Sequence, residues 1–372
     1  MNGDDAGWQK IRAALPIDGV TLLRRPDDGK KTSLVRYGDE LESTLEGLGL
    51  TATPVSLRMD ATKGLSRFVA DGMIKPFVEL VLRRKGRNRV VHAADEMAGF
   101  AFPWSESIRV VTVHHVITPG ERGPLYYSIW KLLSTLAIRH ADSIITVSDE
   151  TAADVLAAFK VDPDKITVIP HRTGAAFRPT GAKKTRRVCC VGELVPRKNI
   201  SDSILAFNEF LSLGGVSDYT MVICGEGSEK TALSNLVKDL GISDKVSFVS
   251  GLDDDEMVQL LETSMAFLVT SLHEGFGMTI LEAQSCGTPT LHLSTSRLPA
   301  VAFGASIPCG SVADMAEKLH ELVTDENLYA EQVRKSLAYA EGFREGFGEK
   351  LLSAYLLGSR TRAGNGGSQD GS

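Results

Sequence analysis

The chain has 372 residues, of which 43% are hydrophobic and 24% are charged, and its formal net charge is −6. This composition is typical of a globular protein, and the length fits two domains rather than one. The acidic balance, without aromatic residues between clustered bases, predicts no nucleic-acid partner.

Both the N-terminus and the cysteines predict a cytoplasmic protein. Residues 1–5 are acidic and lack the basic start and apolar core of a signal peptide. No apolar run reaches the roughly 18–20 residues that span a bilayer. The five cysteines lie in apolar or small-residue settings without metal-ligand spacing, so we interpret them as reduced hydrophobic residues.

Short apolar runs alternate with amphipathic stretches through the first half of the chain. The runs predict strands at residues 19–23, 53–57, 90–93, 109–114, 143–147 and 165–170. Helical spacing predicts helices at residues 34–48, 126–140 and 150–159. Ser148 follows a strand and precedes two acids, which predicts a helix N-cap.

Two segments of this half are candidates for contact with a membrane surface. Five bases lie within seven positions at residues 83–89. Such a cluster is either a solvated helix end or a patch for anionic lipid or phosphate. Residues 126–133 are apolar and aromatic, which suits a membrane surface, but packing of this helix into the core is the favoured interpretation.

A second series of strands and helices follows a loop-like linker. Strands are predicted at residues 188–191, 219–224, 246–249, 266–269 and 288–293. Helices are predicted at residues 202–213, 230–240 and 254–262. This alternation predicts an α/β fold with two doubly wound parallel domains. The cleft between two such domains is the expected ligand site.

The predicted organisation has six parts. These are an N-terminal extension (1–18), a first domain (19–170), a linker (171–186), a second domain (187–340), a helix returning to the first domain (341–360) and a disordered Gly/Ser-rich tail (361–372).

The most informative segment is residues 273–283, which carries Glu274 and Glu282 after a predicted strand. Ligands of open parallel sheets bind beyond the carboxyl ends of the strands. Glycines on both sides of Phe276 let the backbone approach a ligand, and the following helix N-terminus suits an anion. Two carboxylates around an anion site indicate a ligand that also carries hydroxyls. A solvated loop acid and a helix-surface acid are the alternative, which spacing alone leaves open.

A second segment carries adjacent cations after the first strand of the second domain. Gly192 ends that strand, and Arg197 and Lys198 precede a helix. Arginine binds phosphate bidentately and lysine adds a mobile charge, so the pair suits a diphosphate leaving group. An exposed pair of bases in a loop is the alternative.

These two segments together resemble the retaining glycosyltransferases of family four, which have two Rossmann-like domains facing across a cleft in the GT-B arrangement. The resemblance covers residues 19 to about 350 and implies an acceptor-side domain at residues 19–170 and a nucleotide-sugar-binding domain at residues 187–340. It includes residues 111–114, 141–148 and 166–170, and their order makes the set specific.

The resemblance implies a role for each matching residue. Arg197 and Lys198 neutralise the diphosphate of a nucleotide-sugar donor, so that neither a metal nor another cofactor is required. Glu274 accepts from the sugar hydroxyls and Glu282 from the ribose hydroxyls. His114 faces the donor sugar from the first domain, and a buried histidine bonded to a backbone carbonyl is its alternative. The implied donor-binding set is Gly192, Arg197, Lys198, Glu274, Gly275, Phe276, Gly277 and Glu282.

Several positions depart from the family pattern or imitate other motifs. Residues 24–33 keep only one glycine where the family has a Gly-Gly turn, which puts acceptor binding there in doubt, although Lys30 or Lys31 could meet a phosphate. His171-Arg172 replaces the family's Asn-Gly. Residues 253–255 imitate an acidic metal motif but suit a helix N-terminus. Residues 225–227 are a weak dinucleotide signal without a third glycine.

The implied activity is transfer of a sugar to a hydroxyl of a saccharide or lipid-linked acceptor, in cell-surface polysaccharide or glycolipid biosynthesis. The implied place is the cytoplasm, with peripheral contact at the inner membrane face. A non-catalytic GT-B protein that binds nucleotide sugars, or another GT-B enzyme such as an epimerase, is the alternative.

Overall fold

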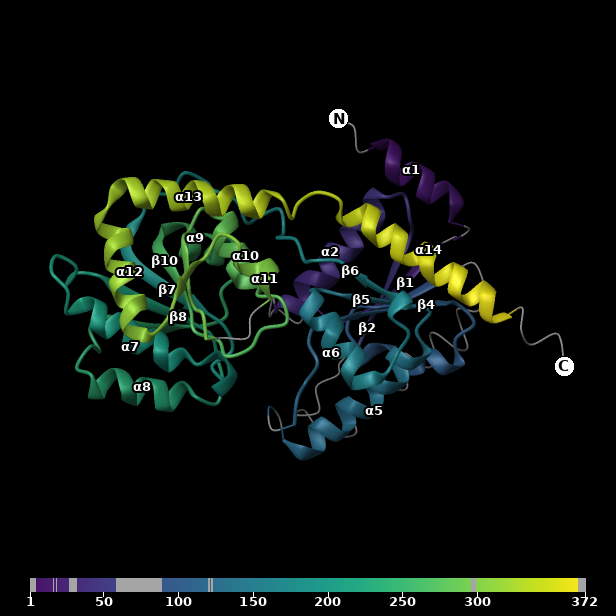
Figure 1. Ribbon diagram of the computed structural model, residues 1–372, viewed down its shortest axis with the longest axis horizontal. Helices are drawn as coiled ribbons and strands as arrows, with labels where there is room; N and C mark the ends of the chain where they lie inside the picture. The colour runs from purple at the N-terminus through teal and green to yellow at the C-terminus, as the bar shows by residue number, and fades with distance from the viewer. Residues whose placement is uncertain are drawn as a thin grey trace. The chain divides into compact units, whose positions relative to one another are not determined.

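The chain divides into two compact units, residues 1–171 with 345–372 (unit 1) and residues 172–344 (unit 2). The computed structural model describes residues 5–15, 17, 19–26, 32–57, 89–119, 121, 123–295 and 299–366. Figure 1 shows strands and helices in both units. Lys30, Lys31 and all of the basic cluster except Arg89 lie outside the described residues.

Unit 1 contains, within its described residues, a six-stranded sheet of order β2-β1-β3-β4-β5-β6 in which all neighbours are parallel. Its strands are β1 Gly19–Arg24, β2 Ala52–Ser56, β3 Arg89–Ala93, β4 Ile108–Val113, β5 Ser143–Thr146 and β6 Ile166–Val168. Its helices are α1 Asp5–Ala14, α2 Ser33–Gly47, η4 Ala98–Trp104, α5 Pro124–His140, α6 Asp149–Phe159, η5 Pro163–Lys165 and α14 Phe347–Gly366. All six predicted strands of this half are present.

Unit 2 repeats the architecture with a parallel sheet of order β12-β11-β10-β7-β8-β9 in the described part. Its strands are β7 Thr185–Val191, β8 Thr220–Cys224, β9 Val246–Val249, β10 Ser264–Val269, β11 Thr290–Leu293 and β12 Ile307–Cys309. Its helices are η6 Pro196–Lys198, α7 Ile200–Leu211, α8 Lys230–Asp239, α9 Asp254–Thr263, α10 Met278–Ser285, α11 Ala300–Phe303, α12 Val312–Thr324 and α13 Glu326–Glu341. The predicted α/β class with two parallel sheets is confirmed.

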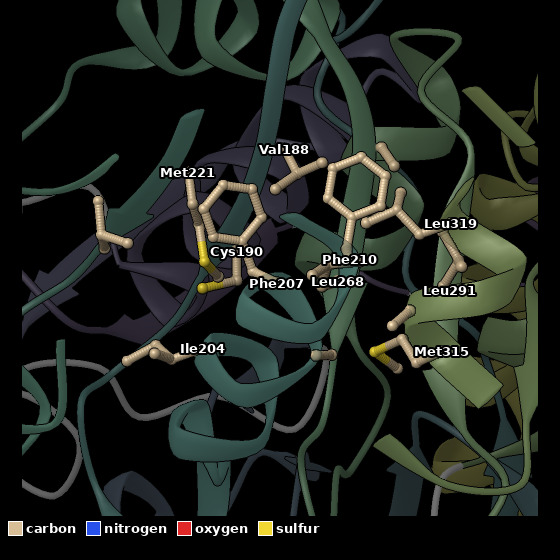
Figure 2. Close-up of a cluster of buried hydrophobic side chains, with 14 of the residues drawn as sticks. Val188, Cys190, Ile204, Phe207, Phe210, Met221, Leu268, Leu291, Met315 and Leu319 are labelled. Carbon is tan, nitrogen blue, oxygen red and sulfur yellow. The ribbon is translucent and has the colours of Figure 1, made fainter. Parts of the chain in front are cut away.

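Alternation along β7 sends its side chains into two separate cores of unit 2. Val188 and Cys190 join the core beneath α7 and α12, which Figure 2 shows, while Cys189 joins the core on the other face. Phe207 and Phe210 of α7 stack in the first core with ring centroids 6.1 Å apart. A parallel sheet buried on both faces needs such apolar strands, which explains the continuous hydrophobic runs of the sequence.

Local capping fixes where two predicted helices begin. The Ser148 hydroxyl accepts from Thr151 N at 3.1 Å, which confirms it as the N-cap of α6. Asp253 and Glu256 form a reciprocal capping box at the start of α9. The acids at residues 253–255 therefore have a helix-terminal role, as expected.

The predicted packing of residues 126–133 is confirmed by the surroundings of α5. Trp130 is buried and packs edge-on against Phe159, with ring centroids 6.1 Å apart. Its Nε1–H donates to Glu96 Oε1 at 2.9 Å. Among the described helices, none is long and apolar enough to cross a bilayer.

Helix α14 runs to Gly366, although the composition predicts disorder from residue 361. Arg362 supplies the reason, because its Nη1 lies 3.4 Å from the buried Asp142 carboxylate and its Nη2 lies 3.5 Å from Ser105 O. Within the predicted part of this helix, a Cβ at Gly358 would lie 2.9 Å from Ile108. The glycine allows the helix to lie close against β4.

Candidate active site

Two loops of unit 2 meet where β7 and β10 end, because these neighbouring strands are parallel and end at the same edge of the sheet. Arg197 lies in η6 after β7 and contacts the loop after β10 through two hydrogen bonds. Its carbonyl accepts from Leu272 N at 2.8 Å, and its Nη1–H donates to His273 O at 2.6 Å. The two predicted ligand-binding segments therefore form one structure.

Glu274 lies at the centre of this structure. Arg197 Nη1 lies 3.2 Å from its Oε2, Lys198 Nζ bonds its Oε1, and the Ser271 hydroxyl donates to Oε1 at 2.7 Å. Burial raises the pKa of Glu274, but the charges of Lys198 and Arg197 outweigh burial and lower it to about 2. The carboxylate is ionised at neutral pH, and its side chain is only 10% exposed.

The Gly-Phe-Gly turn connects this carboxylate to helix α10. Gly277 has φ of 93°, a left-handed conformation that favours glycine, and α10 begins at the next residue. Phe276 is buried and packs edge-on against Phe343 at 6.1 Å. Its ring therefore anchors the turn, and the backbone at Gly275 and Gly277 is the part that suits close approach to a ligand.

Glu282 lies on α10 and is only 1% exposed. Burial of Cys286 raises the pKa of its thiol to about 12, and the nearby charge of Glu282 adds to this rise. The alternative of a solvated loop acid and a helix-surface acid is wrong, because Glu274 and Glu282 are both largely or fully buried. Contact of Glu282 with a ribose stays a prediction.

The glycines at residues 225–227 support the loop that carries the cations. A Cβ at Gly225 would overlap the Gly192 carbonyl, and one at Gly227 would overlap the Leu194 backbone. Leu194 N donates to Glu226 O at 2.9 Å, which joins the two strand ends. The spacing of Gly225 and Gly227 therefore reflects close backbone packing rather than a dinucleotide-binding fingerprint. Gly192 itself faces the Lys198 side chain, because a Cβ added at Gly192 would lie 3.3 Å from Lys198 Cε.

His114 follows β4 in unit 1, where both ring nitrogens have partners. Its Nε2 lies 2.7 Å from Ala94 O, and its Nδ1 lies 3.1 Å from His171 Nε2. Burial lowers the pKa of His114 to about 4, so the ring is neutral at pH 7. Because a carbonyl only accepts, Nε2 carries the proton, and Nδ1 accepts from His171. The backbone-carbonyl bond of the alternative interpretation is present, and contact with a donor sugar stays a prediction.

A buried network that sequence reasoning missed lies beside this pair. His92 Nδ1 lies 2.9 Å from the Tyr355 hydroxyl, and its Nε2 lies 2.9 Å from Thr112 Oγ1. The Tyr37 hydroxyl lies 3.0 Å from the same Thr112 oxygen, and its ring meets His114 edge-on at 4.7 Å. The network joins α2, β3, β4 and α14, and only His92 inside an apolar predicted strand signalled it.

The first loop of unit 1 has its arginines paired with acids. Arg24 bonds Asp39 and lies 2.7 Å from Glu42, both on α2. Arg25 Nε lies 3.1 Å from the buried Asp95 carboxylate. Residues 27–31 lie outside the described residues, so the effect of the missing Gly-Gly turn on acceptor binding stays a prediction.

His115, the residue after His114, has a local partner. Its Nε2 lies 2.9 Å from Glu121 Oε2. Burial raises the pKa of Glu121, but hydrogen bonds from His115 and Thr118 lower it to about 2. No group of three or more potential metal ligands occurs in the described part of the chain.

Acidification is expected to destabilise unit 1 because three of its histidines, His92, His114 and His171, are buried as neutral rings. Burial lowers the pKa of His92 to about 3 and of His171 well below its usual value. The unfolded chain takes up protons near pH 6.5, so stability is complete above that pH and falls below it. We expect a loss of about 1 kcal/mol per histidine between about pH 7 and about pH 5.5.

Denaturant titration at several pH values measures this slope. Glu96 opposes it, because burial and the Asp95 charge raise its pKa to about 7 and favour the folded state on acidification. His92→Gln removes one buried neutral histidine and should flatten the dependence of stability on pH. His140→Gln, at an exposed site, should leave this dependence unchanged. An unchanged slope in the His92 variant would contradict the prediction.

Comparison with known proteins follows the same division of the chain. A family model described as glycosyl transferases group 1 matches residues 175–338, and one described as glycosyltransferase family 4 matches residues 65–171. The two matches together identify the chain as a glycosyltransferase of the family-4 type.

The chain is 32% identical over 238 residues to a D-inositol 3-phosphate glycosyltransferase of Acidothermus cellulolyticus. The match covers 58% of this chain and 53% of the relative. The chain thus spans about half the length of the curated relatives it matches.

Two solved structures show the fold. A sucrose-phosphate synthase of Thermosynechococcus elongatus has a TM-score of 0.70 and 15% identity, over 94% of this chain and 100% of that one. The Anabaena protein HepE in complex with UDP-glucose has a TM-score of 0.66 and 15% identity, over 94% and 99%. At these identities the likeness concerns the GT-B fold alone.

Proposed function

We propose that the chain is a retaining glycosyltransferase that moves a sugar from a nucleoside-diphosphate sugar to a hydroxyl of a saccharide or lipid-linked acceptor. The observation that carries the proposal is the cluster of Arg197, Lys198 and Glu274 at the ends of β7 and β10. It combines two cations for a diphosphate with an ionised carboxylate for sugar hydroxyls, at the edge where parallel sheets bind ligands.

The leaving group is the centre of the proposed mechanism. As the bond between the sugar and the diphosphate breaks, negative charge grows on the phosphate oxygens, and Arg197 and Lys198 stabilise it. These cations do the work of a divalent metal, so none is required. The N-terminus of α10 adds the favourable end of its dipole.

The carboxylates orient the donor in this mechanism. Glu274 accepts from the sugar hydroxyls and Glu282 from the ribose, while His114 faces the sugar. The acceptor attacks on the face that the diphosphate leaves, and a phosphate oxygen of the donor takes the acceptor proton. That route retains the anomeric configuration without a glycosyl-enzyme, unlike retaining glycosidases with a carboxylate nucleophile.

The relatives support the substrate classes without naming the substrates. The Anabaena structure holds UDP-glucose, and the Acidothermus relative is named for an inositol phosphate. We infer a nucleotide-sugar donor and a hydroxyl-bearing acceptor, with a role in polysaccharide or glycolipid biosynthesis. Peripheral membrane contact in the cytoplasm is part of the same proposal.

Thermal unfolding with UDP-, GDP- and ADP-sugars tests the donor site. At least one should raise the melting temperature with EDTA present, because ligand binding to the folded state stabilises it. An unchanged melting temperature with all of these nucleotide sugars would contradict the proposal. Binding without turnover across acceptors that carry hydroxyls would instead favour a non-catalytic nucleotide-sugar-binding protein, the alternative function.

A further inference from the structure

The cations that the proposed diphosphate needs are already engaged by Glu274. Lys198 bonds Oε1 of this carboxylate, and Arg197 Nη1 lies 3.2 Å from Oε2. The three side chains are 14%, 26% and 10% exposed for Lys198, Arg197 and Glu274, so water competes weakly for these contacts. The carboxylate therefore balances one of the two positive charges of the cluster before any ligand arrives.

A diphosphate and Glu274 therefore compete for the positive charge of the same two cations. Arg197 Nη1 is already shared between Glu274 and His273 O, which lies 2.6 Å away. Each Glu274 oxygen holds one cation, and Ser271 gives Oε1 only one neutral donor at 2.7 Å. Turning a cation toward phosphate removes a charge-assisted bond from a mostly buried carboxylate, which opposes binding.

Hydroxyl donors on the ligand reverse this balance. A nucleotide sugar brings hydroxyls that donate to Glu274 while its diphosphate takes the cations. A nucleoside diphosphate brings the same phosphates without those hydroxyls. Binding of the two groups is thus coupled through one carboxylate, and such coupling is reciprocal.

From this geometry we infer that Glu274 discriminates the sugar-bearing donor from the nucleoside diphosphate product, by claiming Arg197 and Lys198 whenever no sugar hydroxyls are present. The inference rests on the proposed function for the identity of the ligand. It assigns to one residue both recognition of the donor and weakening of product binding after transfer.

Calorimetric titration of UDP, GDP and ADP into the wild type and Glu274→Gln tests the inference. The amide removes the competing charge but keeps the size, so the variant should bind a nucleoside diphosphate about tenfold tighter. The matching nucleotide sugar should gain less or bind more weakly. Glu317→Gln, which makes the same charge change at an exposed position on α12, should leave both affinities unchanged.

A second measurement tests the coupling in the wild type itself, so it remains informative if a variant fails to fold. Free glucose, mannose or galactose should tighten nucleoside-diphosphate binding severalfold in the wild type, by giving Glu274 its hydroxyl donors, and should have no such effect in Glu274→Gln. Equal or weaker nucleoside-diphosphate binding by a folded Glu274→Gln would overturn the inference. So would a lack of coupling with all three hexoses.

The same titrations separate this inference from the proposed function. If neither protein binds any nucleoside diphosphate or nucleotide sugar, the donor site itself is wrong and the inference falls with it. If the wild type binds both ligands but Glu274→Gln changes neither affinity, the donor site stands and only the discriminating role of Glu274 fails.

Discussion

Gly225→Ala is expected to destabilise unit 2 by about 3 kcal/mol or more, because the new methyl has no space. Its Cβ would overlap the Gly192 carbonyl oxygen, lie 3.0 Å from Gly192 C and approach Leu194 at 3.4 Å. The first two are backbone atoms of Gly192, whose N–H donates to Cys224 O at 3.0 Å, so they cannot turn aside as a side chain would. Urea unfolding followed by circular dichroism measures the loss.

Gly214→Ala provides the matched control. A Cβ there meets no atom within 4 Å, and the residue does not have a left-handed φ. This variant should be within about 0.5 kcal/mol of the wild type or slightly more stable. Equal stability of the two variants would mean that the ends of β7 and β8 separate easily, and that the cation loop is not fixed by this packing.

The fold could be predicted largely because buried parallel strands leave a clear signal. Eleven runs were predicted as strands, and each overlaps a strand of the structure. Strand β12 was missed because it has three residues, one of which is Pro308, and so short a run has no measurable period. The extension of α14 was missed because Gly/Ser-rich composition predicts disorder, while the contacts of Arg362 with Asp142 and Ser105 depend on the folded arrangement.

The candidate site was predicted in its residues but not in its contacts. Strand ends and adjacent glycines placed Arg197, Lys198 and Glu274 at one edge of a sheet. The sequence could not show that Glu274 bonds both cations, because that depends on side-chain reach between two loops that are far apart in the chain. Ser271 was also missed, because a serine three residues before Glu274 in the same loop has no pattern that shows which group its hydroxyl contacts.

The histidines of unit 1 show a different limit. His114 was chosen by resemblance, yet its environment is set by His171 and Tyr37, which come from distant parts of the chain. A lone histidine after a strand predicts neither its tautomer nor its partners. Only the folded arrangement shows that both nitrogens of His114 have partners within unit 1.

Lys198→Met is expected to lower kcat by about 10²–10³-fold, the usual effect of removing one group that stabilises developing negative charge. Methionine keeps most of the length of the side chain, so contact with Gly192 can persist while the charge is lost. Initial rates with a turned-over nucleotide sugar measure the effect. Lys238→Met, at an exposed position on α8, makes the same exchange and should retain wild-type kcat.

The double variant Lys198→Met with Glu274→Gln separates the two effects of losing this lysine. Lys198 both stabilises the leaving diphosphate and holds Glu274, so the single variant leaves Glu274 bonded to Arg197 alone among the cations of the cluster. Arg197 then becomes less available to phosphate, and donor KM should rise together with the fall in kcat. Removing the Glu274 charge as well should restore part of the donor affinity but not kcat, because the cation at the leaving group is still absent. Restoration of kcat would show instead that Lys198 acts only by neutralising Glu274.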